Sequence, residues 1–318
     1  MNLSKQIIAG NITALSKGIT LLESTLESDE HKARKLVTDC FAESGNSIRI
    51  GITGVPGVGK STFIETFGKL LTSKGKKVAV LAVDPTSDKT HGSILGDKSR
   101  MHELSTDKNA FIRPSPNKGT LGGVTNKTQD SIVLCEAAGF NIILIETVGV
   151  GQSETTVSNL VDFFLLLMLA GAGDELQGIK RGIMELADAL IITKSDGENI
   201  QNAKNACLEY KRALHMFPEL TNGWTPQVGI CSAIENSGIT KIYDIVEKFN
   251  FQMLANGWKN ENREKQKIFW LHHTIKEEYG KKKYQNLIKH KRIKEFEKQI
   301  KNGENMYKIL LKIDNEDV

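Results

Sequence analysis

The sequence contains a glycine-rich segment, Gly54-Val55-Pro56-Gly57-Val58-Gly59-Lys60-Ser61, which fits the pattern G-x-x-x-x-G-K-[ST] at every specified position. An apolar run at 48–53 precedes it, and a helical pattern of apolar residues at 62–72 follows it. The segment is therefore expected between a strand end and a helix N-terminus, where backbone N–H groups and the helix dipole attract phosphate. The sequence predicts a nucleoside triphosphate site.

The residues of this loop have separate expected roles. Lys60 is expected to reach the β- and γ-phosphates and to take part in catalysis, and the Ser61 hydroxyl to bind Mg²⁺. The nucleotide-binding residues predicted here are Gly54, Val55, Pro56, Gly57, Val58, Gly59, Lys60, Ser61 and Thr62.

Length and composition exclude several other classes of protein. The chain of 318 residues can bury a large core, and its four cysteines are scattered, which favours neither a disulfide framework nor a zinc site. Its most apolar run, 163–172, is too short to cross a bilayer, and its N-terminus lacks a secretory pattern. We therefore expect a cytoplasmic protein without a membrane partner.

Seven apolar runs alternate with helical stretches in the middle of the chain. They lie at 48–53, 78–84, 110–113, 142–146, 163–169, 189–193 and 228–231. Such runs, without polar alternation, are typical of strands buried on both faces of a parallel sheet. The pattern predicts a doubly wound, mostly parallel α/β domain at 45–250, with an N-terminal helical extension at 1–44 and a C-terminal helical arm at 251–318.

The C-terminal arm carries most of the basic character. Basic residues outnumber acidic ones from Lys259 to Lys301, although the net charge of the whole chain is only +4. Acidic residues are interspersed there, and apolar residues recur at helical spacing. We expect amphipathic helices with a solvated, lysine-rich face rather than a nucleic-acid partner.

A second motif predicts which base is bound. Thr193-Lys194-Ser195-Asp196 directly follows an apolar run and matches [NT]-K-x-D, with Thr where Asn is commoner. Asp196 is expected to accept hydrogen bonds from the guanine N1–H and amine, and the Lys194 stem to lie along the base. Ser232 and Ala233, after the last predicted strand, would back the base. The predicted cofactors are GTP or GDP, with Mg²⁺.

Further polar residues follow other strands. Glu146 is expected to contact Mg²⁺, Gly149 to meet the γ-phosphate, and 149–154 to switch with nucleotide state, the alternative being a structural glycine turn. Asp84 and Asp97 are expected to hold Mg²⁺ waters or orient the attacking water; helix capping is the alternative. The predicted metal site thus comprises Ser61, Asp84, Asp97 and Glu146.

The glycine-rich segment 171–182 is a candidate mobile loop, from which Lys180 or Arg181 could reach phosphates or a partner. Val150 stands directly after Gly149, where Ras-like proteins place a water-orienting Gln. Slow intrinsic hydrolysis is the resulting hypothesis.

Taken together, these segments resemble the methylmalonyl-CoA mutase-associated GTPases, also called the MeaB or ArgK-type family. The resemblance rests on 54–62, 84–87, 92–101, 113–116, 119–123, 146–154 and 171–180. It implies a GTPase domain of the signal-recognition-particle/MinD class and a homodimer formed through the C-terminal arm. It also implies that 171–180 is a third switch, and we expect Lys180 of that segment to be a catalytic residue.

The resemblance further implies a GTP-hydrolysing chaperone. Such a protein gates the delivery of adenosylcobalamin to an acyl-CoA mutase and protects that mutase, so that adenosylcobalamin belongs to the partner. Three alternatives stay open: a kinase of amino-acid-binding transport proteins, a nickel-inserting GTPase, and a scaffold with a degenerate nucleotide site. The nickel alternative needs Cys and His ligands, and Cys135 has none close by in sequence.

Overall fold

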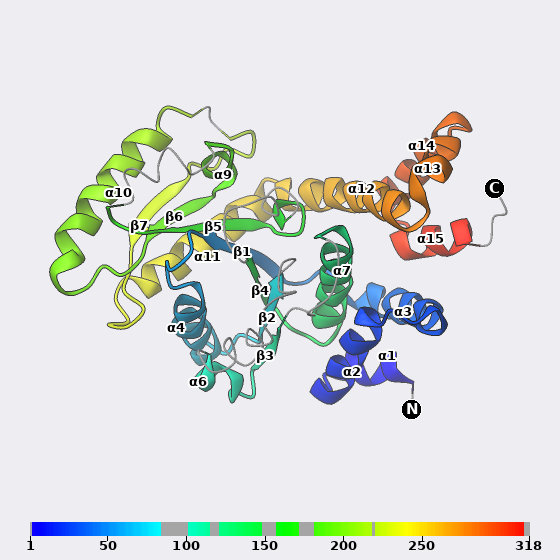
Figure 1. Cartoon of the computed structure of the whole chain (residues 1–318), viewed down its shortest axis with the longest axis horizontal. Helices are drawn as coiled ribbons and strands as arrows, with labels where there is room; N and C mark the ends of the chain where they lie inside the picture. The colour runs from blue at the N-terminus through cyan, green and yellow to red at the C-terminus, as the bar shows by residue number, and fades with distance from the viewer. Residues whose placement is uncertain are drawn as a thin grey trace. The chain divides into compact units, whose positions relative to one another are not determined.

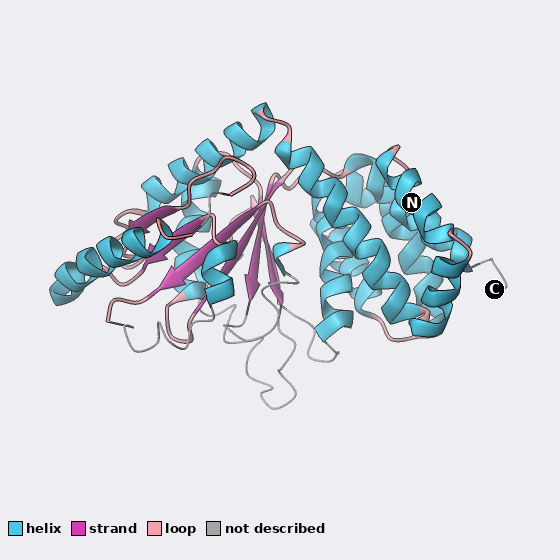
Figure 2. Cartoon of the chain, turned by 90° about the horizontal axis from the view of Figure 1, so that it is seen from above, coloured by secondary structure: helices cyan, strands magenta, loops and turns pink. Residues whose placement is uncertain are grey.

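A computed structural model describes residues 2–83, 101–114, 121–147, 157–171, 181–217 and 220–314. By its internal contacts the chain divides into two compact units. The sheet unit consists of Ile48–Lys118 and Asn141–Lys259, and the helical unit consists of Met1–Ser47, Gly119–Phe140 and Asn260–Val318. Figures 1 and 2 show the strands of the first unit and the helices of the second.

The sheet unit is built on a seven-stranded sheet whose pairings are all parallel, which confirms the predicted fold class. The strands are β1 (Ile48–Gly54), β2 (Val78–Val83), β3 (Ala110–Arg113), β4 (Ile142–Thr147), β5 (Phe163–Met168), β6 (Ala189–Ile192) and β7 (Gln227–Ile230). Their order is β3-β2-β4-β1-β5-β6-β7. Each strand coincides with an apolar run of the sequence to within one residue at either end.

The centre of the sheet determines where a ligand can bind. Strand β1 pairs with β4 on one side, Ile52 opposite Glu146, and with β5 on the other, Gly54 opposite Leu167. The chain thus leaves β1 toward one edge of the sheet and later returns to build the other edge. In open parallel sheets, ligands bind outside the carboxyl ends of the strands at such a reversal. The ends of β1 and β4 lie at this position.

Helices cover the sheet. Those of the sheet unit are α4 (Lys60–Ser73), α6 (His102–Ser105), α9 (Arg181–Leu186), the 3₁₀ turn η3 (Gly197–Asn199), α10 (Ile200–Leu214) and α11 (Ile239–Ala255). Helix α4 packs on β1 and β2, and α10 packs on β6 and β7. Because these two connections run in opposite directions across the sheet, right-handed crossovers place the helices on opposite faces (Figure 1). The strands between them, β4 and β5, are buried at every residue.

The helical unit combines segments from three parts of the chain. Its helices are α1 (Leu3–Ile8), α2 (Ile12–Glu23), α3 (Glu27–Cys40), η1 (Phe41–Glu43), α7 (Leu121–Ala137), α12 (Trp258–Glu278), α13 (Gly280–Lys289), α14 (Arg292–Lys301) and α15 (Met306–Asp314). Gly18 of α2 lies against α1 and α7, since a Cβ there would stand 2.9 Å from Ile7 and 3.2 Å from Leu134. No helix in the described ranges is long and apolar enough to cross a membrane.

Two buried charged side chains hold the segment that precedes β1. Glu136 of α7 accepts hydrogen bonds from the Ser47 hydroxyl at 2.6 Å and from the Gly45 N–H at 2.7 Å. The Arg263 guanidinium of α12 donates to the carbonyls of Gly45 and Ser47 at 2.6 and 2.7 Å. Burying such charges is favourable only when their hydrogen bonds are satisfied, and here both groups bond the same stretch of backbone. That stretch is therefore fixed within the helical unit.

Candidate functional site

The glycine-rich loop connects β1 directly to α4, as the motif predicts. Gly54 ends the strand, and a Cβ there would lie only 2.4 Å from the Leu167 carbonyl oxygen of β5, so only glycine fits without displacement. Gly59 is the N-cap of α4 in a left-handed conformation (φ 87°) and supplies no capping side chain. The first N–H groups of α4 are thus directed at the loop without a side-chain cap. An anion such as phosphate satisfies groups of this kind.

Lys60 points back into this loop. Its ammonium donates to the Gly54 carbonyl at 3.1 Å, across the space that the phosphate loop encloses. Burial lowers the pKa of Lys60, and the nearby Glu146 carboxylate acts in the opposite direction. Negative charge brought into the loop would favour the ammonium form further.

Ser61 and Glu146 meet beside the loop. The Ser61 hydroxyl, in the first turn of α4, donates to Glu146 Oε1 at 3.4 Å. Ser61 is 8% exposed and Glu146, on β4, is 9% exposed. Next to them Thr147 donates to Thr53 at 2.8 Å, which joins the ends of β4 and β1. Hydroxyl and carboxylate oxygens are hard donors, the ligand type that Mg²⁺ requires. Because these two oxygens lie close together, Ser61 and Glu146 fit that ion.

Thr193 connects the second motif to the phosphate loop. Its hydroxyl donates to the Val58 carbonyl at 2.8 Å and lies 3.2 Å from the Met168 carbonyl oxygen. Thr193 is buried directly after β6, and its backbone N–H bonds Met168 of β5. The residue that departs from the commoner Asn thus makes a direct bond to the loop.

Lys194 lies beside the same loop. Its backbone has a positive φ of 53°, and its Cε stands 4.0 Å from the position of a Cβ on Gly59. The Asn199 side-chain amide donates to the Lys194 carbonyl at 2.7 Å and holds this unusual conformation. Lysine carbons therefore flank the loop, as a stem that covers a base would.

Asp196 is fixed by the element that follows β7. The Ser232 hydroxyl donates to Asp196 Oδ2 at 2.5 Å, and the Ser195 N–H donates to the Cys231 carbonyl at 3.0 Å. Ser232 is fully buried, whereas Asp196 is partly exposed. One carboxylate oxygen is thus anchored by Ser232, and the group remains accessible to a ligand. A carboxylate held in this way can accept two hydrogen bonds from guanine.

Two residues that the sequence analysis did not single out complete the arrangement. Asn199 supports Lys194, and the Thr66 hydroxyl of α4 donates to the Ala233 carbonyl at 3.1 Å. The signal for Asn199 is weak, a polar residue shortly after Asp196. Thr66 gives no signal, because threonine on an exposed helix face is common in sequences. The structure therefore brings the phosphate loop, the Thr193–Asp196 motif and Ser232–Ala233 together in one site.

Other predicted site residues lie outside the described residues. They are Asp84, Asp97, Gly149, Lys180 and the switch segment 149–154. Their proposed roles remain predictions. Among the described residues no group of three or more His, Cys, Asp and Glu could hold a metal ion, and Cys135 is fully buried on α7.

Comparisons with known proteins agree with this geometry. A probable GTPase of Mycobacterium tuberculosis is 45% identical over 302 residues, which is 95% of this chain and 90% of the relative. GTPase ArgK of Escherichia coli is 44% identical and covers 86% of this chain and 83% of its own length. The mouse protein called methylmalonic aciduria type A homolog, mitochondrial, is 48% identical over 85% of this chain and 68% of its own length.

A solved structure and a family profile extend the match. The crystal structure described as a LAO/AO transport system kinase superposes with a TM-score of 0.76 at 34% identity, covering 99% of this chain and 97% of that chain. The profile of the family described as methylmalonyl-CoA mutase-associated GTPase MeaB matches residues 15–287. With the assembled phosphate loop and the matched relatives, these findings place the chain in the MeaB family of P-loop GTPases, enzymes that hydrolyse GTP.

Proposed function

We propose that this GTPase is a chaperone for an adenosylcobalamin-dependent acyl-CoA mutase. GTP binding and hydrolysis would gate delivery of adenosylcobalamin to the mutase and protect the mutase from inactivation. The observation that carries the proposal is the match of 15–287 to a family described as associated with methylmalonyl-CoA mutase. The name of the mouse relative, which refers to methylmalonic aciduria, supports the same client.

The described side chains suggest how the nucleotide would be held. Lys60 would exchange its bond to the Gly54 carbonyl for the β- and γ-phosphates, while Ser61 and Glu146 would hold Mg²⁺. The bound ion would neutralise charge on the phosphate oxygens. In this proposal Asp84 and Asp97 support the metal and the attacking water, Gly149 contacts the γ-phosphate, and Lys180 acts in catalysis.

The bond from Thr193 to Val58 gives the proposal a means of linking base and phosphate. Asp196 would select guanine, and Thr193, three residues before it, is bonded to the loop that surrounds the phosphates. A change in the phosphate loop therefore acts directly on the segment that binds the base. This arrangement suits a protein in which the base-binding segment and the phosphate loop respond together to the bound nucleotide.

Two further properties belong to the proposal. The protein would act in the cytoplasm as a homodimer, with helices α12 to α15 providing the dimerisation arm. Apolar residues such as Trp270 and Leu271 are buried within the helical unit of the single chain. Dimerisation would therefore have to use other faces of these helices, such as that of the half-exposed Ile288.

The decisive experiment measures phosphate release from GTP and from ATP by the purified chain. It is run with and without an adenosylcobalamin-dependent acyl-CoA mutase from the same genome. We expect slow GTP turnover that the mutase accelerates, no ATP turnover, and nucleotide-dependent transfer of adenosylcobalamin to the apo-mutase. A lack of response to any such mutase would contradict the chaperone proposal while leaving the GTPase activity intact.

A kinase of amino-acid-binding transport proteins is the second candidate, favoured by the name of the solved structure that superposes over 99% of the chain. The same assay distinguishes it, because a kinase transfers the γ-phosphate to protein rather than to water. Labelled phosphate on a purified binding protein, in place of free phosphate, would establish the kinase. We expect free phosphate only.

A further inference from the structure

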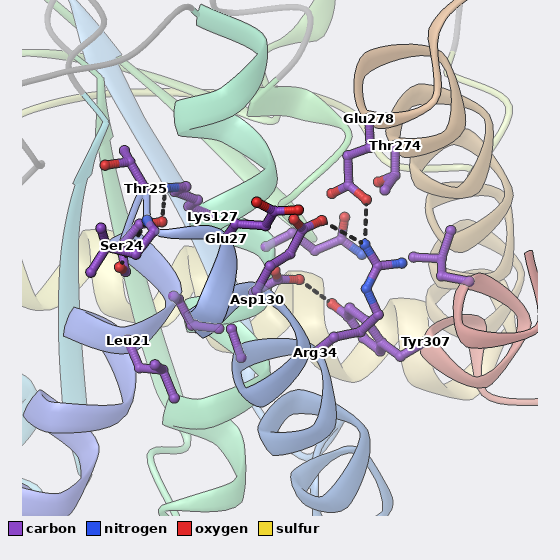
Figure 3. A pocket seen from close by; sticks show the side chains of 16 residues that line it. Leu21, Ser24, Thr25, Glu27, Arg34, Lys127, Asp130, Thr274, Glu278 and Tyr307 are labelled. Carbon is purple, nitrogen blue, oxygen red and sulfur yellow. Dashed lines mark hydrogen bonds and ion pairs between the residues drawn. The ribbon is translucent and has the colours of Figure 1, made fainter. Parts of the chain in front are cut away.

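The helical unit contains a cavity of about 340 Å³. It lies between the start of α3, the middle of α7, the end of α12 and α15, with the α2–α3 turn at one side (Figure 3). Its volume falls within the range of small-molecule pockets in proteins. None of its lining residues belongs to the predicted nucleotide site.

The charges around this cavity are unbalanced. Four acidic side chains line it, Glu27, Glu30, Asp130 and Glu278, against two basic ones, Arg34 and Lys127. Full ionisation would leave an excess of negative charge in a partly desolvated space. Such an excess is costly unless a counter-charge or proton supplies compensation.

Arg34 cannot supply that compensation to the whole group. Its guanidinium is engaged by Glu278 at 2.7 Å, by Asp314 at 3.3 Å and by Glu30 at 3.5 Å, and it donates to the Tyr279 hydroxyl at 2.8 Å. Three carboxylates thus share one cation. Asp130 is directed instead at Tyr307, whose hydroxyl donates to it at 2.5 Å (Figure 3).

Lys127 does not neutralise Asp130 by contact either. The Lys127 ammonium donates to the Ser24 carbonyl at 3.3 Å, and its electrostatic influence is divided between Glu23 and Asp130. Burial raises the pKa of Asp130 to about 7, while the Tyr307 hydrogen bond and the charges of Arg34 and Lys127 act in the opposite direction. Among the described residues, the Asp130 carboxyl group therefore forms no ion pair with a cation.

The cavity is also lined by a polar side chain from α12. Thr274 of α12 lines the cavity and is only 6% exposed, yet within the described part of the chain its hydroxyl makes no hydrogen bond. Its hydroxyl oxygen is not one of the fully buried polar atoms that lack a partner, so it is open to the cavity, where a ligand or a water molecule can bond it. This observation is independent of the acidic charges and indicates the same space.

Aliphatic side chains from α2 and α15 also line the cavity. Leu21, Leu22 and Leu310 line the cavity beside the charged groups. A ligand that suits both kinds of wall carries positive charge at its end and methylene groups along its body. We propose that this cavity binds a small aliphatic ammonium compound, a di- or polyamine, of which one ammonium group pairs with Asp130 and another donates to Thr274 while its methylenes lie on the leucines.

The test is calorimetric titration of the full chain with 1,4-diaminobutane near pH 8 and moderate salt. We expect saturable binding at one site, weakened about tenfold or more by Asp130→Asn and less strongly by Thr274→Val, in keeping with the loss of a charged and a neutral hydrogen bond. Asp130→Asn keeps an acceptor for Tyr307, so it is expected to fold. Glu295→Gln, which removes an exposed carboxylate on α14 away from the cavity, is the matched control and is expected to bind as the unchanged chain does.

The pH dependence provides an independent readout. Glu27, Glu30 and Arg34 on α3, Lys127 on α7, Glu278 on α12 and Tyr307 on α15 are the titratable groups that face Asp130 or line its cavity. Because Asp130 gains its negative charge near neutral pH, diamine affinity is expected to rise from about pH 6 to about pH 8 and to do so less in Asp130→Asn.

Three outcomes would overturn the proposal. They are the absence of binding at millimolar diamine, equal weakening by Asp130→Asn and Glu295→Gln, and preferential binding of glutarate, a dianion of similar length. The last would assign the cavity to an anion held by Lys127.

Discussion

The nucleotide site and the cavity of the helical unit both bring together residues from distant parts of the chain, but they are assembled by different means. In the first, Gly54, Glu146 and Thr193 each lie at or just after the end of a parallel strand, so the sheet brings them together. In the second, Arg34, Asp130 and Tyr307 line one cavity only because α3, α7 and α15 pack together. The first kind of site can be recognised from motifs, whereas the second depends on helix packing.

The largest expected effect is loss of catalysis at the nucleotide site. Lys60→Ala removes the ammonium that would neutralise the γ-phosphate, and we expect GTP hydrolysis to fall about 100-fold or more with little change in unfolding temperature. Lys69→Ala, an exposed lysine on the same helix, is the control and should retain activity. Comparable losses in the two variants would show that Lys60 has no special role.

Base selection is the next test. In Asp196→Asn the side chain presents an amide donor where guanine requires an acceptor, so the preference for GTP over ATP should fall about 100-fold or more. Xanthosine triphosphate has an oxygen in place of the guanine amine and should recover part of the activity. Unchanged GTP selectivity in this variant would remove Asp196 from the base site.

Two glycines of the phosphate loop distinguish the cost of a steric contact from the cost of a positive φ. A Cβ at Gly54 would meet the Leu167 carbonyl at 2.4 Å, whereas one at Gly57 would meet nothing within 4 Å and suffer only from its φ of 76°. We expect Gly54→Ala to lower the free energy of unfolding by about 1–3 kcal/mol and Gly57→Ala by about 1 kcal/mol. Chemical denaturation measures both, and the reverse order would contradict the close contact between β1 and β5.

A further test concerns the pH dependence of stability in the helical unit. Because the pKa of Asp130 is raised from 3.8 to about 7 in the folded chain, the folded state binds a proton more tightly than the unfolded state between these values. Stability therefore falls as pH rises through this window, and Asp130→Asn should remove about 1–2 kcal/mol of that decline. Denaturant titrations at about pH 5 and about pH 8 test the slope.

Asp188 extends the pH test to the sheet unit. Burial and the neighbouring Asp162 raise the pKa of Asp188 to about 7 also, although it accepts the Phe164 N–H at 2.8 Å. Asp188→Asn should therefore remove a similar part of the slope. If neither variant changes the slope, the two buried carboxyl groups are not the groups that titrate in this range.

Much of the sheet unit could be predicted, and particular residues explain why. The runs at 142–146 and 163–169 lack polar alternation because β4 and β5 are buried on both faces. The motif around Lys60 then identifies β1 as the strand before the phosphate loop and α4 as the helix after it. Tertiary contacts could not be predicted where the residue type gives no hint of its partner. Examples are the bonds of Thr66 to Ala233 and of Glu136 to Gly45.

The strands, the phosphate loop and the base motif could be read from the sequence alone, since each depends on short-range patterns whose chemistry admits few alternatives. Three further features are visible only in the folded chain: Thr193 bonds Val58, Gly18 lets α2 approach α7, and α7 groups with the terminal helices. The physical reason is that an amphipathic pattern shows that one face of a helix is buried, but not which partner covers it. That choice depends on side-chain packing across the whole chain.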